Sequence, residues 1–120
     1  MTTKQIEAVY ELANSIYNKE IRLVDAKKII SEKFSVNKNS FADYYRAFQK
    51  MLDGELHTRS ISSDLRNYYL DMIYKHYGPN KLKIALDAYM DSIIYYEEAH
   101  NTNMITERNI HKHFYDILLK

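Results

Sequence analysis

Histidine is the side chain best suited to metal binding or proton transfer near neutral pH, and this chain has five of them. His111 and His113 are two residues apart, so on a helix they point to opposite sides. A metal held from one helical face needs a four-residue spacing, which no histidine pair provides. His57, His76 and His100 stand singly. We therefore expect surface or boundary positions for all five and predict no metal site.

Other side chains offer little further chemistry. Asp87 and Asp91 are four residues apart and could share a cation, but such a pair is more often a solvated face, here offset by Lys83. The absence of cysteine excludes thiolate nucleophiles and disulfides. There is no glycine-rich phosphate loop and no Gly-x-Ser-x-Gly motif. We expect no catalytic residue and no cofactor, and we predict that this chain is not itself an enzyme.

Positive charge is concentrated between residues 21 and 52. This segment has seven Lys/Arg and three Asp/Glu, a balance of +4, whereas the whole chain carries +1. Its pattern predicts two helices joined by a polar turn, and a basic helix-turn-helix favours a phosphate backbone as partner. In that motif the start of the second helix faces the major groove.

The expected contacts to double-stranded DNA follow from that geometry. Arg46 or Asn39 would touch bases, while lysines would contact phosphates. The candidate residues of the helical pair are Lys38, Asn39, Ser40, Arg46 and Lys50. The alternative that this helical pair is an ordinary part of a bundle with no DNA contact stays open, because lysine-rich amphipathic helices joined by capped turns occur in most helical bundles.

Tyrosine supports a different hypothesis. Three adjacent pairs, at 44–45, 68–69 and 95–96, would each place one ring in the core and one at its rim on a helix. Tyrosine is enriched at protein interfaces. The alternative function is therefore a protein-interaction or dimerisation module, with a homodimer as one form of it.

The elements that position these residues are predicted to be helices, because two glycines and one proline are too few to separate many short strands. Thr2 and Gln5 form a capping-box pattern, and Asn39 or Ser40 is the expected N-cap of the third helix. Gly54 is expected to end that helix. The predicted helices cover about residues 3–17, 23–34, 39 or 40 to 52, 62 or 63 to 77, 79–99, and 104 or 106 to 119.

Helical periodicity also predicts which side chains face solvent. On the third helix the exposed face would hold Asp43, Arg46, Ala47 and Lys50. On the fifth helix it would hold Asp87, Asp91, Glu97 and Glu98.

The length of 120 residues suits a single all-α domain over residues 1–120, a compact array of about six helices with a helix-turn-helix-like pair near residues 23–52. No stretch reaches membrane-spanning length, and the N-terminus lacks the basic and apolar regions of a signal peptide. We expect a cytoplasmic protein with no membrane partner.

The third helix and the connector after it belong to a set of positions that runs through most of the chain. The set comprises Asn39-Ser40, Asp43-Tyr44, Phe48, Met51-Leu52, Gly54 and Thr58-Arg59-Ser60-Ile61, with Ile21, Leu23 and Ala26 before them and Tyr69-Leu70, Ile73, Gly78, Leu82, Ala85-Leu86, Ile93 and Tyr95-Tyr96-Glu97 after them. On these residues the chain resembles the helical N-terminal head domain that precedes HNH nuclease modules in bacterial McrA-like, modification-dependent restriction endonucleases. His57 departs from the aromatic residue expected before the Thr-Arg pair.

The resemblance implies an accessory DNA-binding or DNA-positioning module of a restriction or phage-defence system. It places no nuclease residue on this chain, so a nuclease domain would be a partner. It also adds Thr58 and Arg59 to the expected contacts, with Arg59 clamping a phosphate. The alternative for Arg59 is a salt bridge to a nearby carboxylate that fixes the connector.

Overall fold

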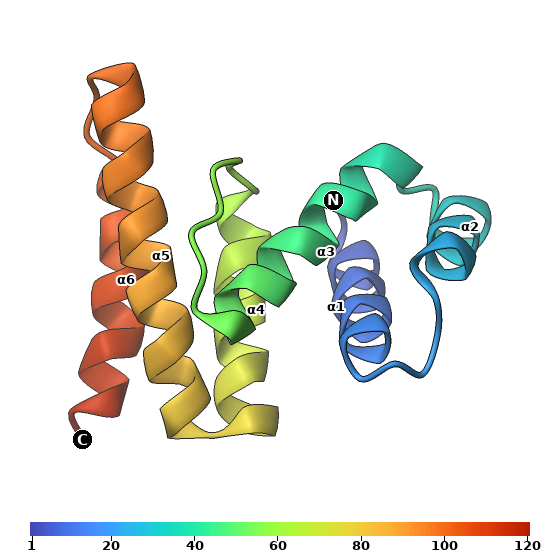
Figure 1. Ribbon diagram of the computed structural model, residues 1–120, viewed down its shortest axis with the longest axis horizontal. Coiled ribbons are helices and arrows are strands. Elements are labelled where there is room, and N and C mark those ends of the chain that lie inside the picture. Colours follow the sequence, from blue (N-terminus) through green and yellow to red (C-terminus); the bar gives the residue numbers. More distant parts are fainter. The chain divides into compact units, whose positions relative to one another are not determined.

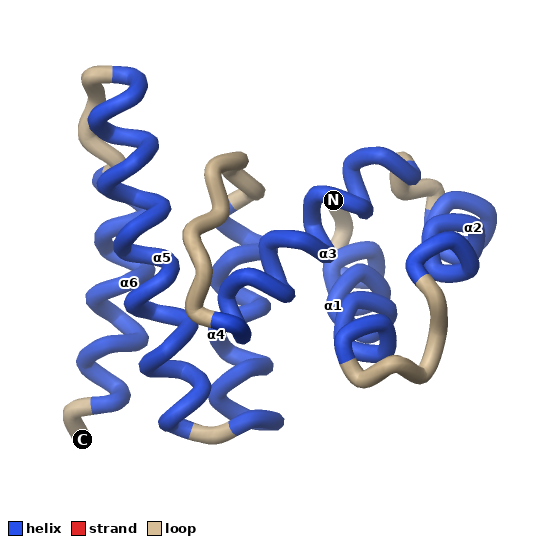
Figure 2. Tube along the Cα trace, in the orientation of Figure 1, coloured by secondary structure: helices blue, strands red, loops and turns tan.

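The computed structural model describes residues 1–120 and contains six α-helices and no strand (Figures 1 and 2). The all-α class and the number of helices predicted from the sequence are confirmed. The helices are α1 (Thr3–Tyr17), α2 (Leu23–Phe34), α3 (Lys38–Asp53), α4 (Ser63–Tyr77), α5 (Pro79–His100) and α6 (Ile105–Leu118).

Contacts divide the chain into two compact units, residues 1–49 and residues 50–120. Helix α3 runs through the boundary, so most of it belongs to the first unit and its last turn belongs to the second. The expectation of a single domain stays a prediction.

The first unit begins with helices α1 and α2, which pack against each other. The predicted capping box is present: the Gln5 amide donates to the Thr2 hydroxyl at 3.2 Å, and the Thr2 amide donates to the Gln5 side chain at 2.7 Å. The Gln5 side chain also donates to the Phe34 carbonyl at 2.9 Å, which ties the start of α1 to the end of α2. One glutamine therefore fixes two helix ends.

The turn between α2 and α3 covers residues 35–37. The sequence predicts a turn two residues longer, over residues 35–39. Ser35 adopts the left-handed conformation that ends α2, with φ of 58°. Asn37, rather than Asn39 or Ser40, caps α3, because its side-chain oxygen accepts the amides of Asn39 at 2.9 Å and Ser40 at 3.0 Å. The prediction of the cap was wrong because Asn37 offers the same chemistry earlier in the chain.

Within the first unit, α3 is held by aromatic contacts. Phe48 is fully buried, and its ring meets those of Tyr10 at 5.5 Å and Tyr17 at 6.1 Å in edge-on geometry. Phe41, two turns earlier, is buried as well. Ala47, predicted to face solvent, is also fully buried, so the prediction for this side chain was wrong: the buried face of α3 is wider than helical period alone indicated.

The second unit begins with the last turn of α3 and contains α4, α5 and α6, each in contact with the other two. Gly54 ends α3 as predicted, with φ of +73°, and Lys81 of α5 donates to the Leu52 carbonyl at 2.9 Å. A side chain at Gly54 would also crowd Ile84, whose Cγ2 would lie 3.0 Å from the new Cβ. Two independent constraints therefore require glycine at this position.

The helices of the second unit start and stop at recognisable signals. Ser62 caps α4 by accepting the Leu65 amide at 3.2 Å. Gly78, with φ of +90°, closes α4, and Pro79 opens α5. The predicted bounds of α4, α5 and α6 therefore agree with the structure to within one or two residues.

Replacing Phe48 by alanine should destabilise the first unit by about 3–5 kcal/mol, because the change leaves a cavity between two tyrosine rings. Urea unfolding followed by circular dichroism measures the effect. Val24→Ala is the matched control, since Val24 is 62% exposed and should cost less than about 0.5 kcal/mol. Equal stabilities of the two variants would contradict this description of the core.

Candidate functional site

The first turn of α3 contains three of the candidate DNA contacts. Because α3 begins at Lys38, the side chains of Lys38, Asn39 and Ser40 all lie on this turn, the first two exposed and the third half-buried. Phe41, which follows, is anchored in the core. The buried Phe41 ring therefore holds the first turn of α3 at the surface of the unit.

Further along α3, Arg46 and Lys50 lie on the helical face opposite Phe41. The Arg46 Nη1 atom is 3.4 Å from Asp43 Oδ1, and Lys50 donates to the Leu56 carbonyl at 3.4 Å. An exposed ion pair of this kind contributes about 0–1 kcal/mol, so Arg46 can exchange Asp43 for another anion at little cost.

The same face of α3 is balanced in charge, since Arg46 and Lys50 are accompanied by Asp43 and Asp53. The excess positive charge of the segment therefore comes from Arg22, Lys38 and α2. The lysines of α2 are the exposed Lys28 and Lys33 and the half-buried Lys27.

Thr58 and Arg59 lie in the connector between α3 and α4, and both are exposed. They belong to the second unit, together with Lys50, whereas Lys38, Asn39, Ser40 and Arg46 belong to the first. The candidate residues before the connector therefore share one helix, α3, whereas Thr58 and Arg59 line a cavity in the second unit.

His57 is buried, at 7% exposure, which contradicts the surface or boundary position expected for it. Its amide donates to the Ser92 hydroxyl at 3.2 Å, so the connector is held against α5. The prediction failed because the nine-residue irregular segment between α3 and α4, residues 54–62, carries no periodicity that would reveal its buried side. The other four histidines lie at the surface or boundary as predicted: His111 is half-buried, and His76, His100 and His113 are exposed.

Arg66 of α4 is the functional candidate that the sequence analysis missed. It is 4% exposed, its Nη1 atom lies 3.2 Å from the Met51 sulfur, and its Cζ atom lies 4.6 Å from the centre of the Tyr89 ring. Burial lowers the pKa of the guanidinium. Helical spacing could have revealed it, because Arg66 precedes the buried Tyr69 and Leu70 by three and four residues.

Tyr89 and Glu107 connect three helices beside Arg66. The Tyr89 hydroxyl donates to the Glu107 carboxylate, and the Ser63 hydroxyl donates to its other oxygen at 2.6 Å. Burial, followed by the bond to Glu107, raises the pKa of Tyr89, so this tyrosine remains a neutral donor. The two hydroxyls occupy both oxygens of the only carboxylate that lines the cavity.

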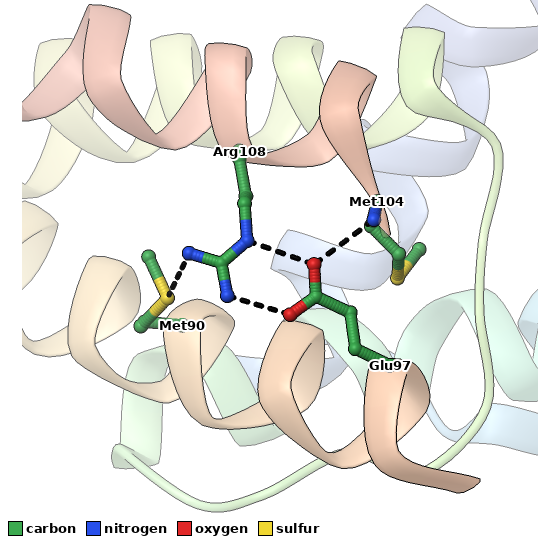
Figure 3. A network of polar contacts seen from close by, with 4 residues as sticks. All are labelled: Met90, Glu97, Met104 and Arg108. Carbon is green, nitrogen blue, oxygen red and sulfur yellow. Dashed lines mark hydrogen bonds and ion pairs between the residues drawn. The ribbon is translucent and has the colours of Figure 1, made fainter. Parts of the chain in front are cut away.

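Glu97 and Arg108 fix the start of α6 against α5 (Figure 3). Arg108 donates to the two Glu97 oxygens at 2.8 and 2.6 Å, and the Met104 amide donates to Glu97 at 2.9 Å. These bonds lower the pKa of Glu97 to about 2, and the bonds from Arg108 have the largest effect. Glu97 was expected on the outer face with Glu98, but it is drawn inward because α6 brings Arg108 alongside.

The other sequence candidates form no metal or membrane site. Lys83 Nζ lies 2.7 Å from Asp87, which confirms the expected offset of the Asp87 charge. No cluster of three or more His, Cys, Asp or Glu is placed to hold a metal ion. None of the six helices combines the length and apolar character needed to cross a bilayer.

Comparison with known proteins gives no match: no protein-family model, no curated protein and no solved structure is significantly similar to this chain.

Glu97→Gln should reduce stability more at about pH 6 than at about pH 3. The depressed pKa of Glu97 means that its ion pair stabilises the fold fully above its ordinary value of 4.5 and loses that contribution as the pH falls through about 2. Urea unfolding at both pH values measures the difference between variant and wild type.

The control for this experiment is Glu98→Gln, which removes an exposed carboxylate next to Glu97. It should change stability by a similar small amount at both pH values. A Glu97→Gln deficit that is the same at both pH values would contradict the assigned role of the ion pair.

Proposed function

We propose that this chain is a non-catalytic, cytoplasmic module that binds or positions double-stranded DNA within a bacterial restriction or phage-defence system. The contacts would come from the start and exposed face of α3 and from the connector after it. The residues concerned are Lys38, Asn39, Ser40, Arg46, Lys50, Thr58 and Arg59.

The observation that carries the proposal is the exposed first turn of α3. Lys38 and Asn39 are exposed at the start of a helix that is anchored in the core by Phe41, two residues further on. The turn before it has three residues, within the range of helix-turn-helix motifs. Such a helix can enter a groove by its N-terminal end without disturbing the packing of the unit.

The distribution of charge supports those proposed contacts that lie in the first unit, Lys38, Asn39, Ser40 and Arg46. Residues 1–49 carry eight Lys/Arg and six Asp/Glu, a net charge of +2, whereas residues 50–120 carry nine and ten, a net charge of −1. Phosphate contacts supply most of the affinity of non-specific DNA binding. The first unit is therefore the expected partner of the duplex.

The assignment to a restriction or defence system comes from the resemblance of α3 and the connector to the head domain of McrA-like endonucleases. That resemblance makes a nuclease domain a second partner. Asn39 and Arg46 are the two side chains in the surface that are able to read base edges.

A protein-interaction or dimerisation module is the alternative function, and the outer face of α5 favours it. Ile84, Ile94 and Tyr95 are 40%, 41% and 44% exposed, and helical spacing places them in one sector with Asp87 and Asp91. Exposed apolar side chains gathered on one face are typical of a contact surface. An acidic border suits a basic partner.

Replacing Lys38, Arg46 and Lys50 together by alanine should weaken duplex binding and flatten its salt dependence by up to about three units of slope, because each phosphate contact contributes about one. Fluorescence anisotropy of a labelled duplex at several salt concentrations measures both quantities. The unmodified chain should bind more weakly as the salt concentration rises.

The matched control removes three positive charges from the second unit, with Lys75, Lys83 and Lys112 replaced by alanine. It has the same net charge as the first triple variant and should retain the wild-type slope. Equal effects of the two triple variants, or no binding at low salt together with a stable dimer in light scattering, would overturn the DNA proposal in favour of the alternative.

A further inference from the structure

A small cavity in the second unit is lined by the buried guanidinium of Arg66. The centre of a water-sized sphere can move through about 20 Å³ of it, which is room for one or two waters or one small ion. The connector residues Thr58, Arg59 and Ser60 form one side of the cavity, while Tyr89 and Glu107 form another. All of these residues belong to residues 50–120.

The charge on Arg66 lacks a counter-ion bonded to it. Its contacts are the Met51 sulfur and the face of the Tyr89 ring, and its Nε atom donates no hydrogen bond. A buried cation in such surroundings costs several kcal/mol unless an anion compensates it. Glu107 favours the charged arginine through space, but its oxygens are already bonded to Tyr89 and Ser63.

We propose that this cavity is a binding site for a phosphate group. Arginine presents its donors in a planar fork that matches the oxygens of phosphate, which makes it the usual residue for this anion. Thr58, Arg59 and Ser60 line the same cavity, so residues with hydroxyl and guanidinium donors form its connector side. The buried positive charge of Arg66 favours an anion there.

The size of the cavity limits the ligand to the phosphate group itself, so the remainder of a larger molecule would lie outside. The group could be the free ion or the phosphate of a nucleotide. The cavity shares Thr58 and Arg59 with the proposed DNA surface, but Arg66, on which the inference rests, is not part of that surface. Failure of duplex binding would leave it unaffected.

The test is a titration of the full chain with inorganic phosphate at constant ionic strength, followed by thermal unfolding. The melting temperature of the wild type should begin to rise when the phosphate concentration reaches the Kd and should then increase with the logarithm of that concentration, because a ligand that binds only the folded state stabilises it. In Arg66→Met, which preserves volume, the apparent Kd should be about tenfold weaker or more, since a charge-assisted hydrogen bond is lost. Lys112→Ala, which removes an exposed charge from α6, should respond as the wild type does.

A second measurement uses the wild type alone, so it does not depend on whether a variant folds. In proton–nitrogen NMR spectra, the Nε–H signal of Arg66 should shift during the phosphate titration with the same Kd as the thermal effect. An unmoved Arg66 signal, or an Arg66→Met variant that keeps the wild-type response, would overturn the proposal.

Competition distinguishes the two sources of the group. Displacement of phosphate by a 5′-phosphorylated dinucleotide, but not by the same dinucleotide without that phosphate, would support a nucleotide-borne group. Displacement by neither would support the free ion. Displacement by both equally would contradict recognition of a terminal phosphate by this cavity.

Discussion

Helix α3 must bury one face along its whole length, and this constraint governs what the molecule can present to a partner. Phe41 and Phe48 anchor its first three turns in the first unit, and Met51 and Leu52 anchor its last turn in the second. Burial of each such side chain contributes about 1.5–3 kcal/mol, far more than any exposed ion pair on the opposite face. The polar side of α3 is therefore fixed by packing and remains available for recognition.

The second unit meets a different requirement, which is to accommodate a charged side chain inside a helical bundle. Arg66 is covered by the Tyr89 ring, and Tyr89 is in turn fixed by the Glu107 carboxylate of α6. The Glu97–Arg108 pair holds the start of α6 in the place that this arrangement needs. A cation at the centre of these contacts is costly for stability, and this cost is the basis for proposing a bound anion.

The sequence predicts the helices well because their signals are local. The capping box at Thr2 and Gln5, the glycines at 54 and 78 and the proline at 79 each act within a turn of their own position. Aromatic positions such as Phe41 and Phe48 follow from helical period alone.

One error is local: Asn37 caps α3 in place of Asn39 or Ser40. The others depend on tertiary structure, since Ala47 is buried, His57 is buried where the connector is held against α5, and Glu97 is half-buried beside Arg108. Arg66 was missed because arginine is usually exposed, although its position lies on the buried face of α4. The candidate residues of α3 were found from charge, but whether they bind DNA is a question that neither spacing nor packing decides.

The central claim is that the start of α3 contacts duplex DNA, and an NMR titration of the full chain with a short duplex tests it most directly. The account predicts that the backbone amide signals of Lys38, Asn39, Ser40 and Arg46 shift as the duplex is added, while those of residues 105–118 in α6 stay in place. Shifts confined to α5 and α6, or no shift at low salt, would contradict it.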